Sequence, residues 1–345
     1  IIMYGFLISI GVVLLIMVIW MVYRIQTLIS VAKGSDKKIA TTSNKVNAIL
    51  FMVFLIGCGA WMIYYSVVEF DNYQLPIGSD HGIVTDRLFW ITMAVTGFIF
   101  ILTHILLFWF SYHYRYDEKR RAAFYPDNNK LEILWTLVPA VVLTVLVISG
   151  WKAWSDITGP APDNAHVVEI MGYQFAWDVR YPGADQQMGS YDYRLTTATN
   201  SRGIDFTDKN AFDDFPSQSV VIPKGEPVLF NIRARDVLHS VFAPHMRLKM
   251  DAVPGMPTRF WFVPNKTTEE MRAELGDEEF EFEIACTEIC GNGHFSMRKI
   301  ITVVEPEEYR KWFAEQTPFI KSNPDLVADL PVELKELAEI YINEE

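Results

Sequence analysis

The residues of this sequence best suited to chemistry are two cysteines, two histidines and a methionine. Cys286, Cys290, His294 and Met297 fall within 12 residues, and His239 stands 47 residues before Cys286. Soft sulfur ligands combined with imidazole suit copper, zinc or iron–sulfur clusters. The methionine favours copper, because a thioether is a poor ligand for zinc and a familiar weak ligand in copper electron-transfer sites. The pattern therefore predicts a copper site.

The number of cysteines indicates two copper ions rather than one. A mononuclear blue copper site uses one Cys, two His and a weak Met. Here Cys286 and Cys290 stand four residues apart. Two thiolates on one loop can bridge two ions and share their charge, so that neither ion moves much on redox. Glu288, between the cysteines, can present its backbone carbonyl to one copper while its carboxylate points away.

Two other interpretations stay open on the spacing alone. Cys286 and Cys290 could form a disulfide beside an incidental His and Met. A Cys2His2 set could instead hold a structural zinc, although this spacing departs from that of common zinc fingers. A covalent haem is excluded, because no Cys-x-x-Cys-His motif occurs. The third cysteine, Cys58, lies in an apolar run and is expected to be inert packing.

Four apolar stretches are long enough to cross a bilayer, which takes about 20 residues each. They run over residues 2–23, 47–68, 89–112 and 131–151. Each lacks charge at its centre, and Trp and Tyr gather near the ends, as they do at membrane interfaces. Soluble folds seldom contain four such runs so close together, so we expect four spanning helices. The chain begins with Ile rather than Met, and we expect that an upstream segment such as a signal peptide is missing.

Charges in the loops predict the orientation of these spans. Loops 24–46 and 113–130 are rich in Lys and Arg, whereas loop 69–88 carries four acidic residues and one Arg. Positive loops stay on the inner side, so both termini lie outside the cytoplasm. Residues 1–151 carry a formal net charge of +2 and residues 152–345 one of −14. An acidic outer surface repels nucleic acid and attracts a basic partner.

Glu132 begins the fourth span on the inner side. The simpler interpretation is a carboxylate at a helix N-terminus, where the helix dipole favours negative charge. The alternative is a proton-handling role, because ionisable residues at membrane depth are costly and often functional. Charge alone favours the simpler interpretation.

After Trp154 the pattern changes from helical to β. Gly and Pro residues at 159–162 form a linker. Eight short runs rich in β-branched and aromatic residues follow, at 166–171, 173–181, 191–196, 218–222, 227–234, 258–263, 280–285 and 298–304. Short strands at this spacing predict a sandwich or a Greek-key barrel.

The remaining segments lie around these strands. Residues 198–216 are polar and irregular, and we expect a surface excursion there. Residues 307–316 are predicted to be helical. The tail 320–345 is acidic, with a short helix predicted at 332–343.

With these motifs in view, the sequence resembles subunit II of the haem–copper cytochrome c oxidases, the dicopper (CuA) subunit. The resemblance implies membrane α-helical segments, here four spans, and an all-β cupredoxin-like Greek-key barrel. It covers about residues 85–318 and rests on five segments: the copper loop 286–297, the ligand segments 236–240 and 249–255, the motif 172–177 and the membrane segment 131–139.

Carried over position by position, the resemblance implies the ligands of two copper ions. These are the side chains of His239, Cys286, Cys290, His294 and Met297, and Glu288 through its carbonyl. The Glu288 carboxylate would also help to hold a Mg²⁺ or Mn²⁺ shared with subunit I, since oxygen ligands suit these ions. Asp251 would lie next to the ligands of that ion. Glu132 resembles a glutamate near the mouth of the family's proton channel.

The resemblance also implies a function and partners. The chain would accept electrons from cytochrome c, or a cytochrome c domain, and pass them to haem in the catalytic subunit I. There O₂ becomes water, coupled to proton translocation, so the catalytic residues lie outside this chain. Other oxidase subunits, membrane lipid and a larger respiratory supercomplex are further expected partners. The implied location is the bacterial cytoplasmic membrane, with the copper domain on the periplasmic side, rather than the mitochondrial inner membrane.

Three features depart from the family pattern. Residues 1–68 form an extra transmembrane pair ahead of the hairpin at 85–154. Most members place a Trp beside the copper site, where this chain has Phe175, with Trp177 two residues on; both are candidate aromatics for electron input. His245 matches no family ligand and is expected to be ordinary. The copper domain is predicted at 155–318 and the acidic tail at 319–345.

Two relatives of this family offer alternative functions. A quinol oxidase subunit II shares the hairpin and the β domain but lacks copper ligands, and the five side chains retained here argue against it. A copper-containing subunit of a nitric oxide reductase remains the alternative, because the terminal chemistry lies in another chain.

Overall fold

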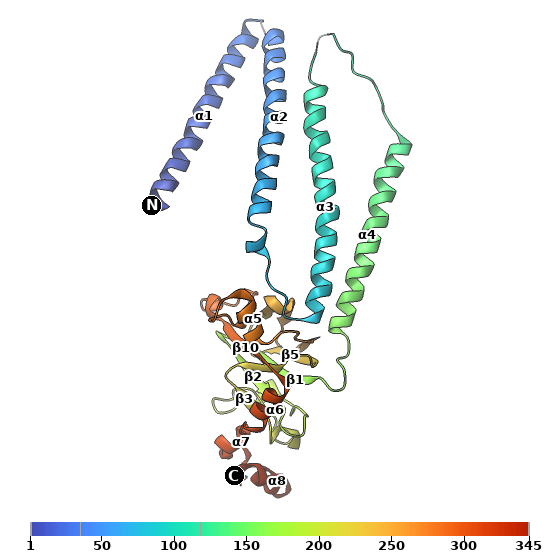
Figure 1. Cartoon of the computed structure of the whole chain (residues 1–345). Helices are drawn as coiled ribbons and strands as arrows, with labels where there is room; N and C mark the ends of the chain where they lie inside the picture. Colours follow the sequence, from blue (N-terminus) through green and yellow to red (C-terminus); the bar gives the residue numbers. More distant parts are fainter. Residues whose placement is uncertain (1, 35, 118, 344–345) are drawn as a thin grey trace. The chain divides into compact units, whose positions relative to one another are not determined.

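The computed structural model describes residues 2–34, 36–117 and 119–343 (Figure 1). Two compact units divide the chain: Ile1–Gln74 with Thr92–Leu137, and Leu75–Ile91 with Val138–Glu345. The last two residues of the predicted acidic tail, 344–345, lie outside the described residues. The second unit contains all the predicted copper ligands.

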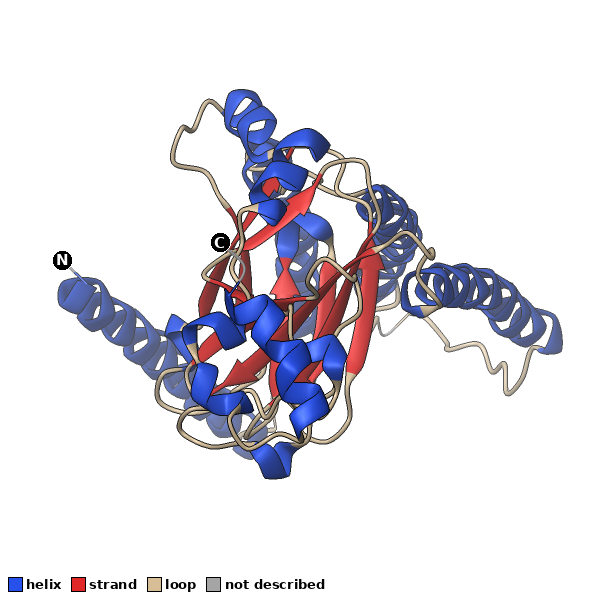
Figure 2. Cartoon of the chain, turned by 90° about the horizontal axis from the view of Figure 1, so that it is seen from below, coloured by secondary structure: helices blue, strands red, loops and turns tan. Residues whose placement is uncertain are grey.

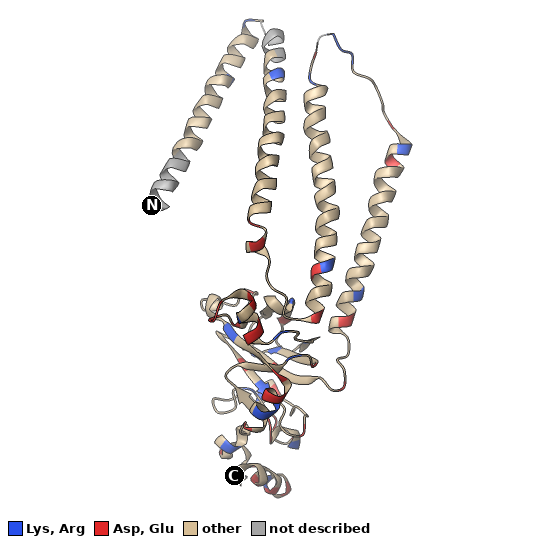
Figure 3. Ribbon diagram, in the orientation of Figure 1, with Lys and Arg blue, Asp and Glu red and all other residues tan. Residues whose placement is uncertain are grey.

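Four long helices confirm the predicted spans. They are α1 (Ile2–Ala32), α2 (Asp36–Val68), α3 (Asp80–His113) and α4 (Asn129–Thr158). Within the described residues, each has the length and apolar composition to cross a membrane. The helices exceed the predicted spans because helical structure continues into the polar segments at their ends. Figure 3 shows this segregation, with charged residues lying toward the ends of the long helices.

The part of the chain after α4 is mainly β (Figure 2). In the described residues its strands are β1 (His166–Tyr173), β2 (Ala176–Tyr181), β3 (Phe215–Ser217), β4 (Val220–Pro223), β5 (Val228–Ala234), β6 (His239–Ala243), β7 (Leu248–Ala252), β8 (Thr258–Phe262), β9 (Phe282–Cys286) and β10 (Arg298–Val304). One sheet has the order β3-β2-β1-β5-β8 and the other β4-β10-β9-β6-β7. Parallel pairs, β1 with β5 and β4 with β10, lie among antiparallel ones.

The hydrophobic core lies between the two sheets. Inward positions alternate along the strands, as with Val228, Phe230 and Ile232 of β5, each fully buried. The same core receives Phe282 and Ile284 from β9 in the other sheet. The alternation places every second side chain on the buried face, so the pattern that predicted these strands also predicts their inward residues.

Some predictions for this domain need correction. The run 191–196 is not a strand: the Asp192 side chain accepts a hydrogen bond from the Arg194 amide and stabilises a 3-10 turn at Tyr193–Leu195. Strand β3 lies at the end of the segment 198–216, which was predicted to be irregular. Strands β6 and β7 were not predicted either. They form a hairpin around a 3-10 turn, Pro244–Met246, which ends at Arg247 in the left-handed conformation. His239 is the first residue of β6.

Further helices follow the strands or lie between them. Besides α5 (Thr268–Leu275), the described residues contain α6 (Pro306–Ala314), α7 (Phe319–Ser322) and α8 (Val332–Asn343). Helices α6 and α8 confirm the two helices predicted for the C-terminal region. The capping box of Thr267 and Glu270 starts α5, a helix that was not predicted from the sequence.

The C-terminal segment packs against the polar excursion between β2 and β3. Their shared apolar residues form a second core, made of Ile204, Phe206, Ala211, Phe212, Ile320, Val327 and Ala338. The Phe319 amide also donates to the backbone oxygen of Asp214 at 2.8 Å. Residues 319–343 of the acidic tail therefore pack against the rest of the β domain.

Candidate metal centre

Neighbouring strands of one sheet bring the predicted ligands together. β6 pairs with β9 so that Val241 lies opposite Cys286. His239, two residues before Val241, therefore lies beside the loop that follows β9. The loop closes on itself where the Cys286 amide donates to the Met297 oxygen at 3.3 Å. The ligand-bearing loop is thus held at both ends by the sheet.

The side chains in this loop face one another at short range. The ligand atoms of His239, Cys286 and Cys290 lie within 4.8 Å of one another. Cys290 Sγ is 3.6 Å from His294 Nδ1 and 3.4 Å from Met297 Sδ. Cys286 Sγ lies 3.9 Å from His239 Nδ1. All five predicted side-chain ligands therefore meet in one cluster.

The backbone of Glu288 also reaches this cluster. Its carbonyl oxygen accepts from the Cys286 thiol, with Sγ and O 3.2 Å apart. No hydrogen bond or ion pair of the Glu288 carboxylate occurs within the described part of the chain. Asp251 is exposed on β7, directly opposite Ser240, whose hydroxyl donates to it at 2.7 Å.

The chemistry of the donor set fits a soft metal ion. Cys286 and Cys290 are both free thiols, so this arrangement does not support the disulfide interpretation. Both are buried, as are His239 and Met297. Two sulfur donors, an imidazole and a thioether in a buried pocket suit copper better than an ion that prefers oxygen.

Metal binding at this site must displace thiol protons. Burial, and then the neighbouring Cys286 thiol, raises the pKa of Cys290 to about 11. The thiolate is the form that binds metals, so a metal ion that binds here releases protons. The cluster without metal is thus expected to hold Cys290 as a neutral thiol.

A chain of hydrogen bonds connects the two sides of the cluster. His239 Nε2 donates to Asp236 Oδ1 at 2.9 Å, which leaves Nδ1 facing the sulfur atoms. Asp236 Oδ2 accepts a hydrogen bond from the backbone amide of Gln174 at 2.8 Å. The side-chain Nε2 of Gln174 donates to the Cys290 carbonyl at 2.6 Å. We call Gln174 and Asp236 the support pair.

The support pair was not assigned a role from the sequence. Asp236 lies three residues before a ligand histidine, and Gln174 lies in the motif 172–177, but neither position alone indicates a contact. Burial tends to raise the pKa of Asp236. Hydrogen bonds from the Gln174 amide, the His239 ring and the Val237 amide outweigh that effect and lower the pKa. Asp236 is therefore the ionised acceptor that fixes the His239 tautomer.

The two candidate aromatic residues take different places. Trp177 is buried behind the cluster, with its ring 5.9 Å from the His239 ring, and its Nε1 donates to the Met297 oxygen at 3.4 Å. Phe175 is exposed and covers the loop glycines. A Cβ at Gly293 would lie 2.5 Å from the Phe175 ring, so only glycine fits there. Phe175 thus stands between the loop and solvent.

Other residues singled out in the sequence lie away from the cluster. Glu132 is in the first turn of α4, where Asn128 Oδ1 accepts from the Leu131 amide. His245 packs edge-on against Phe280 and Phe282. Burial lowers the pKa of His245, as does Arg247.

The loop also exposes two large apolar side chains. Phe295 is 90% and Ile289 82% exposed, although Ile289 precedes the buried Cys290 and Phe295 follows the half-buried His294. Exposed apolar groups at a site typically mark a surface for a partner.

The fold and this site define a class of protein: a membrane-anchored, cupredoxin-like β domain with a candidate copper site. A profile of "Cytochrome C oxidase subunit II, periplasmic domain" matches residues 166–304, and one of its transmembrane domain matches residues 79–152. The alternative cytochrome c oxidase subunit 2 of Bradyrhizobium diazoefficiens is 32% identical over 79% of this chain and 93% of that protein. The chain belongs to the cytochrome c oxidase subunit II family.

Other similarities are weaker. Cytochrome c oxidase subunit 2 of Cereibacter sphaeroides is 28% identical over 65% of this chain and 72% of that protein. A structural match to the crystallised periplasmic domain of subunit II of cytochrome oxidase of Bradyrhizobium japonicum covers 44% of this chain and 94% of that one. Its sequence identity is 23% and its TM-score 0.29.

Proposed function

We propose that this chain is the electron-accepting subunit of a haem–copper oxidase. It takes electrons from cytochrome c and passes them to haem in subunit I, where O₂ is reduced to water and protons are translocated. The observation that supports this proposal most strongly is the buried cluster of His239, Cys286 and Cys290, whose ligand atoms lie within 4.8 Å of one another. The oxygen-reducing chemistry then belongs to the partner subunit.

The residues of this chain would hold two copper ions. His239, Cys286, Cys290, His294 and Met297 supply side-chain ligands, and Glu288 supplies its carbonyl. When bound, the copper pair supplies one-electron redox chemistry. The protein contributes rigidity, because ligands held by strands β6, β9 and β10 move little when the charge changes. The support pair orients His239 and the Cys290 carbonyl.

Other parts of the proposal concern the surroundings of the copper site. The Glu288 carboxylate, with Asp251 nearby, would hold Mg²⁺ or Mn²⁺ at the junction with subunit I. Phe175 is the better candidate for electron input, because it is exposed beside the loop while Trp177 is buried. Glu132 would stand at the mouth of a proton channel. The complex would lie in the bacterial cytoplasmic membrane, with other oxidase subunits, lipid and a wider respiratory supercomplex as partners.

Metal analysis and electron paramagnetic resonance of the purified whole chain test the copper proposal. We expect two coppers per chain and a spectrum of one unpaired electron shared by both. Cys290→Ser should abolish that shared spectrum, whereas Met297→Leu should retain copper with a shifted potential. Cys58→Ser, at an exposed cysteine on α2, is the matched control and should change nothing.

The same experiment can refute the proposal. A single zinc ion, or a shared-valence spectrum that survives Cys290→Ser, would show that the ligand assignment is wrong. A chain with no metal and full quinol oxidation by its complex would instead favour the quinol oxidase alternative.

A further inference from the structure

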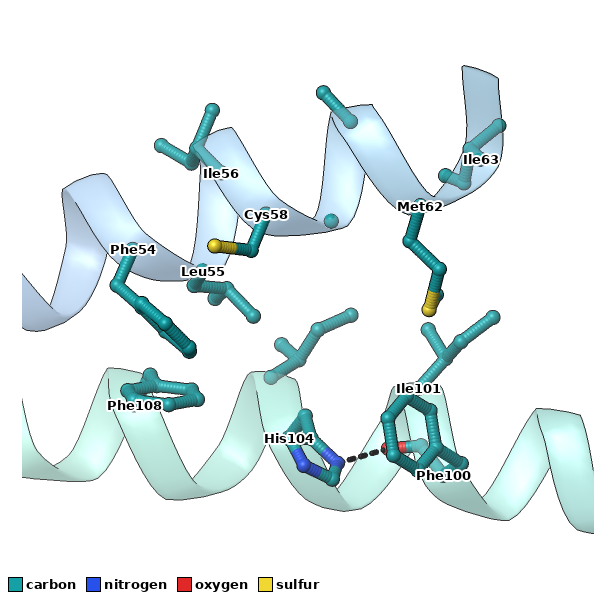
Figure 4. Close-up of a pocket in the computed structure, with 13 residues that line it drawn as sticks. Phe54, Leu55, Ile56, Cys58, Met62, Ile63, Phe100, Ile101, His104 and Phe108 are labelled. Atoms are coloured by element: carbon teal, nitrogen blue, oxygen red, sulfur yellow. Dashed lines mark hydrogen bonds between the residues drawn. The ribbon is translucent and has the colours of Figure 1, made fainter. Parts of the chain in front are cut away.

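A groove lies between the membrane helices α2 and α3, within one compact unit of the chain (Figure 4). Its volume is about 530 Å³. In Figure 4, Phe54 and Met62 extend from α2 toward α3. Almost all of the groove surface is hydrocarbon or aromatic, contributed by residues such as Leu55, Ile101 and Phe108. Among the residues that line the groove, only His104 and Cys58 have ionisable side chains.

The hydrogen bond of His104 fixes which ring nitrogen carries the proton. Its Nδ1 lies 2.8 Å from the Phe100 carbonyl oxygen. A carbonyl oxygen only accepts, so Nδ1 must donate. In a neutral imidazole the other nitrogen, Nε2, is then an acceptor.

This acceptor needs a donor that the described residues do not supply. No hydrogen bond to His104 Nε2 occurs within the described part of the chain. His104 lies nine residues before the end of α3, so it sits about 14 Å along the axis from that end. Bulk water does not reach such a depth. An unsatisfied acceptor there costs free energy, which a ligand with an O–H group would recover.

The rings around His104 indicate the shape of that ligand. The Phe100 ring lies 4.0 Å from the His104 ring, centroid to centroid. Phe108 packs 5.6 Å from Phe54 across the groove. Aromatic side chains arranged in this way favour a flat ring that stacks on them, and the aliphatic remainder of the groove suits an alkyl or isoprenoid tail.

We propose that the groove binds a membrane quinol, with its phenolic O–H donating to His104 Nε2. The site is a binding site for the lipid and takes no part in the copper chemistry, so it goes beyond the proposed electron transfer. It also gives a role to α2, which belongs to the extra N-terminal pair. A quinol carries the donor that Nε2 needs, whereas a quinone carries only acceptors.

The test measures binding of decyl-hydroquinone to the whole chain in phosphatidylcholine nanodiscs. The dimethyl ether of the same compound is the matched ligand, because it keeps the ring and tail but has no O–H. We expect the hydroquinone to bind about tenfold more tightly than its ether, the effect of one buried hydrogen bond. His104→Phe should remove that difference, and His104→Gln, which keeps an acceptor, should restore part of it.

A second histidine on the same helix provides the control. His113 lies at the end of α3 and outside the groove, so His113→Phe should retain the tenfold preference. Equal binding of the hydroquinone and its ether, undiminished binding in His104→Phe, or no saturable binding would each overturn the proposal. The last outcome would mean that acyl chains or a partner's helix fill the groove. If His104→Phe does not fold, the comparison of the two ligands on the unmodified chain still tests whether the O–H group contributes to binding.

Discussion

Gln174 and Asp236 show how little contact is needed to hold a metal loop in place. Three hydrogen bonds between 2.6 and 2.9 Å run from the His239 ring to the Cys290 carbonyl. They join a strand residue to a loop residue that is 51 positions away in the sequence. Partners of this kind commonly orient metal ligands and tune their affinity. The support pair should therefore matter to copper without contacting it.

Gln174→Leu tests this expectation. The substitution removes the hydrogen bond to the Cys290 carbonyl and should lower the stability of the metal-free chain by about 1 kcal/mol. Copper should also dissociate about tenfold faster or more. Gln187→Leu, at an exposed position, is the control. Equal copper release rates for the two variants would show that the contact is incidental.

At the scale of elements, strands β1, β2 and β5 share a buried ion network. Arg180 donates to both carboxylate oxygens of Glu169 and, at 2.8 Å, to Asp214. Arg233 donates to Glu169 at 2.9 Å. Burial would raise the pKa of Glu169, but the guanidinium groups of Arg180 and Arg233 lower it to about 2. Removing one partner would leave an uncompensated buried charge.

This network predicts a pH dependence of stability. The pKa of Glu169 falls from its ordinary 4.5 to about 2 on folding. Its contribution is therefore fully present above pH 4.5 and is lost as pH falls toward 2, by roughly 3 kcal/mol in total. Denaturant midpoints at pH 5 and pH 3, followed by tryptophan fluorescence, measure it. Glu169→Gln should be less stable at pH 5 but lose less on acidification; parallel losses would contradict the assignment.

Helix α8 closes the second core over the excursion between β2 and β3. Ala338 is fully buried there, while its neighbour Leu337 is 44% exposed. Ala338→Glu buries a charge and should destabilise the second core by more than about 2 kcal/mol. Limited proteolysis within 198–216 should then accelerate. Leu337→Glu makes the same chemical change on the exposed face, and faster cleavage in that variant would show that α8 responds to charge alone.

Local pattern predicted some of these elements and missed others for identifiable reasons. The spans, seven strands and helices α6 and α8 have periodic apolar residues that act within one segment. The hairpin of β6 and β7 escaped because its turn depends on Arg247 in a left-handed conformation, rare outside glycine. The sequence also predicted the five candidate copper ligands, which lie on one loop and one strand. It could not indicate the support pair or the second core, which depend on contacts between distant segments.

At the scale of the whole molecule, charge separates along the chain. Residues 152–345 carry a formal net charge of −14 and the first 151 residues one of +2, which together give −12 for the chain. An acidic domain of this kind steers basic partners toward it, with rates that fall as salt increases. The exposed Phe295 and Ile289 then offer an apolar contact at the metal loop itself.

Ionic strength should therefore control electron donation. The rate of reduction of the complex by a basic cytochrome c should fall about tenfold as salt rises from low to physiological levels and beyond. Stopped-flow kinetics across a salt series measure it, with an acidic cytochrome c as the control. If the rate with the basic donor did not change with salt, the acidic surface would not be what selects the partner.

The first turns of α3 are fastened to the turn between β6 and β7. Arg247 donates to both carboxylate oxygens of Asp86, at 2.6 and 2.8 Å, and the Ser79 hydroxyl donates to the Met246 oxygen. From that clasp, β6 runs five residues back to His239, about 17 Å of extended chain. The length of β6 therefore fixes the distance between the Arg247–Asp86 contact and the predicted metal loop. An insertion or deletion along the strand would change that distance.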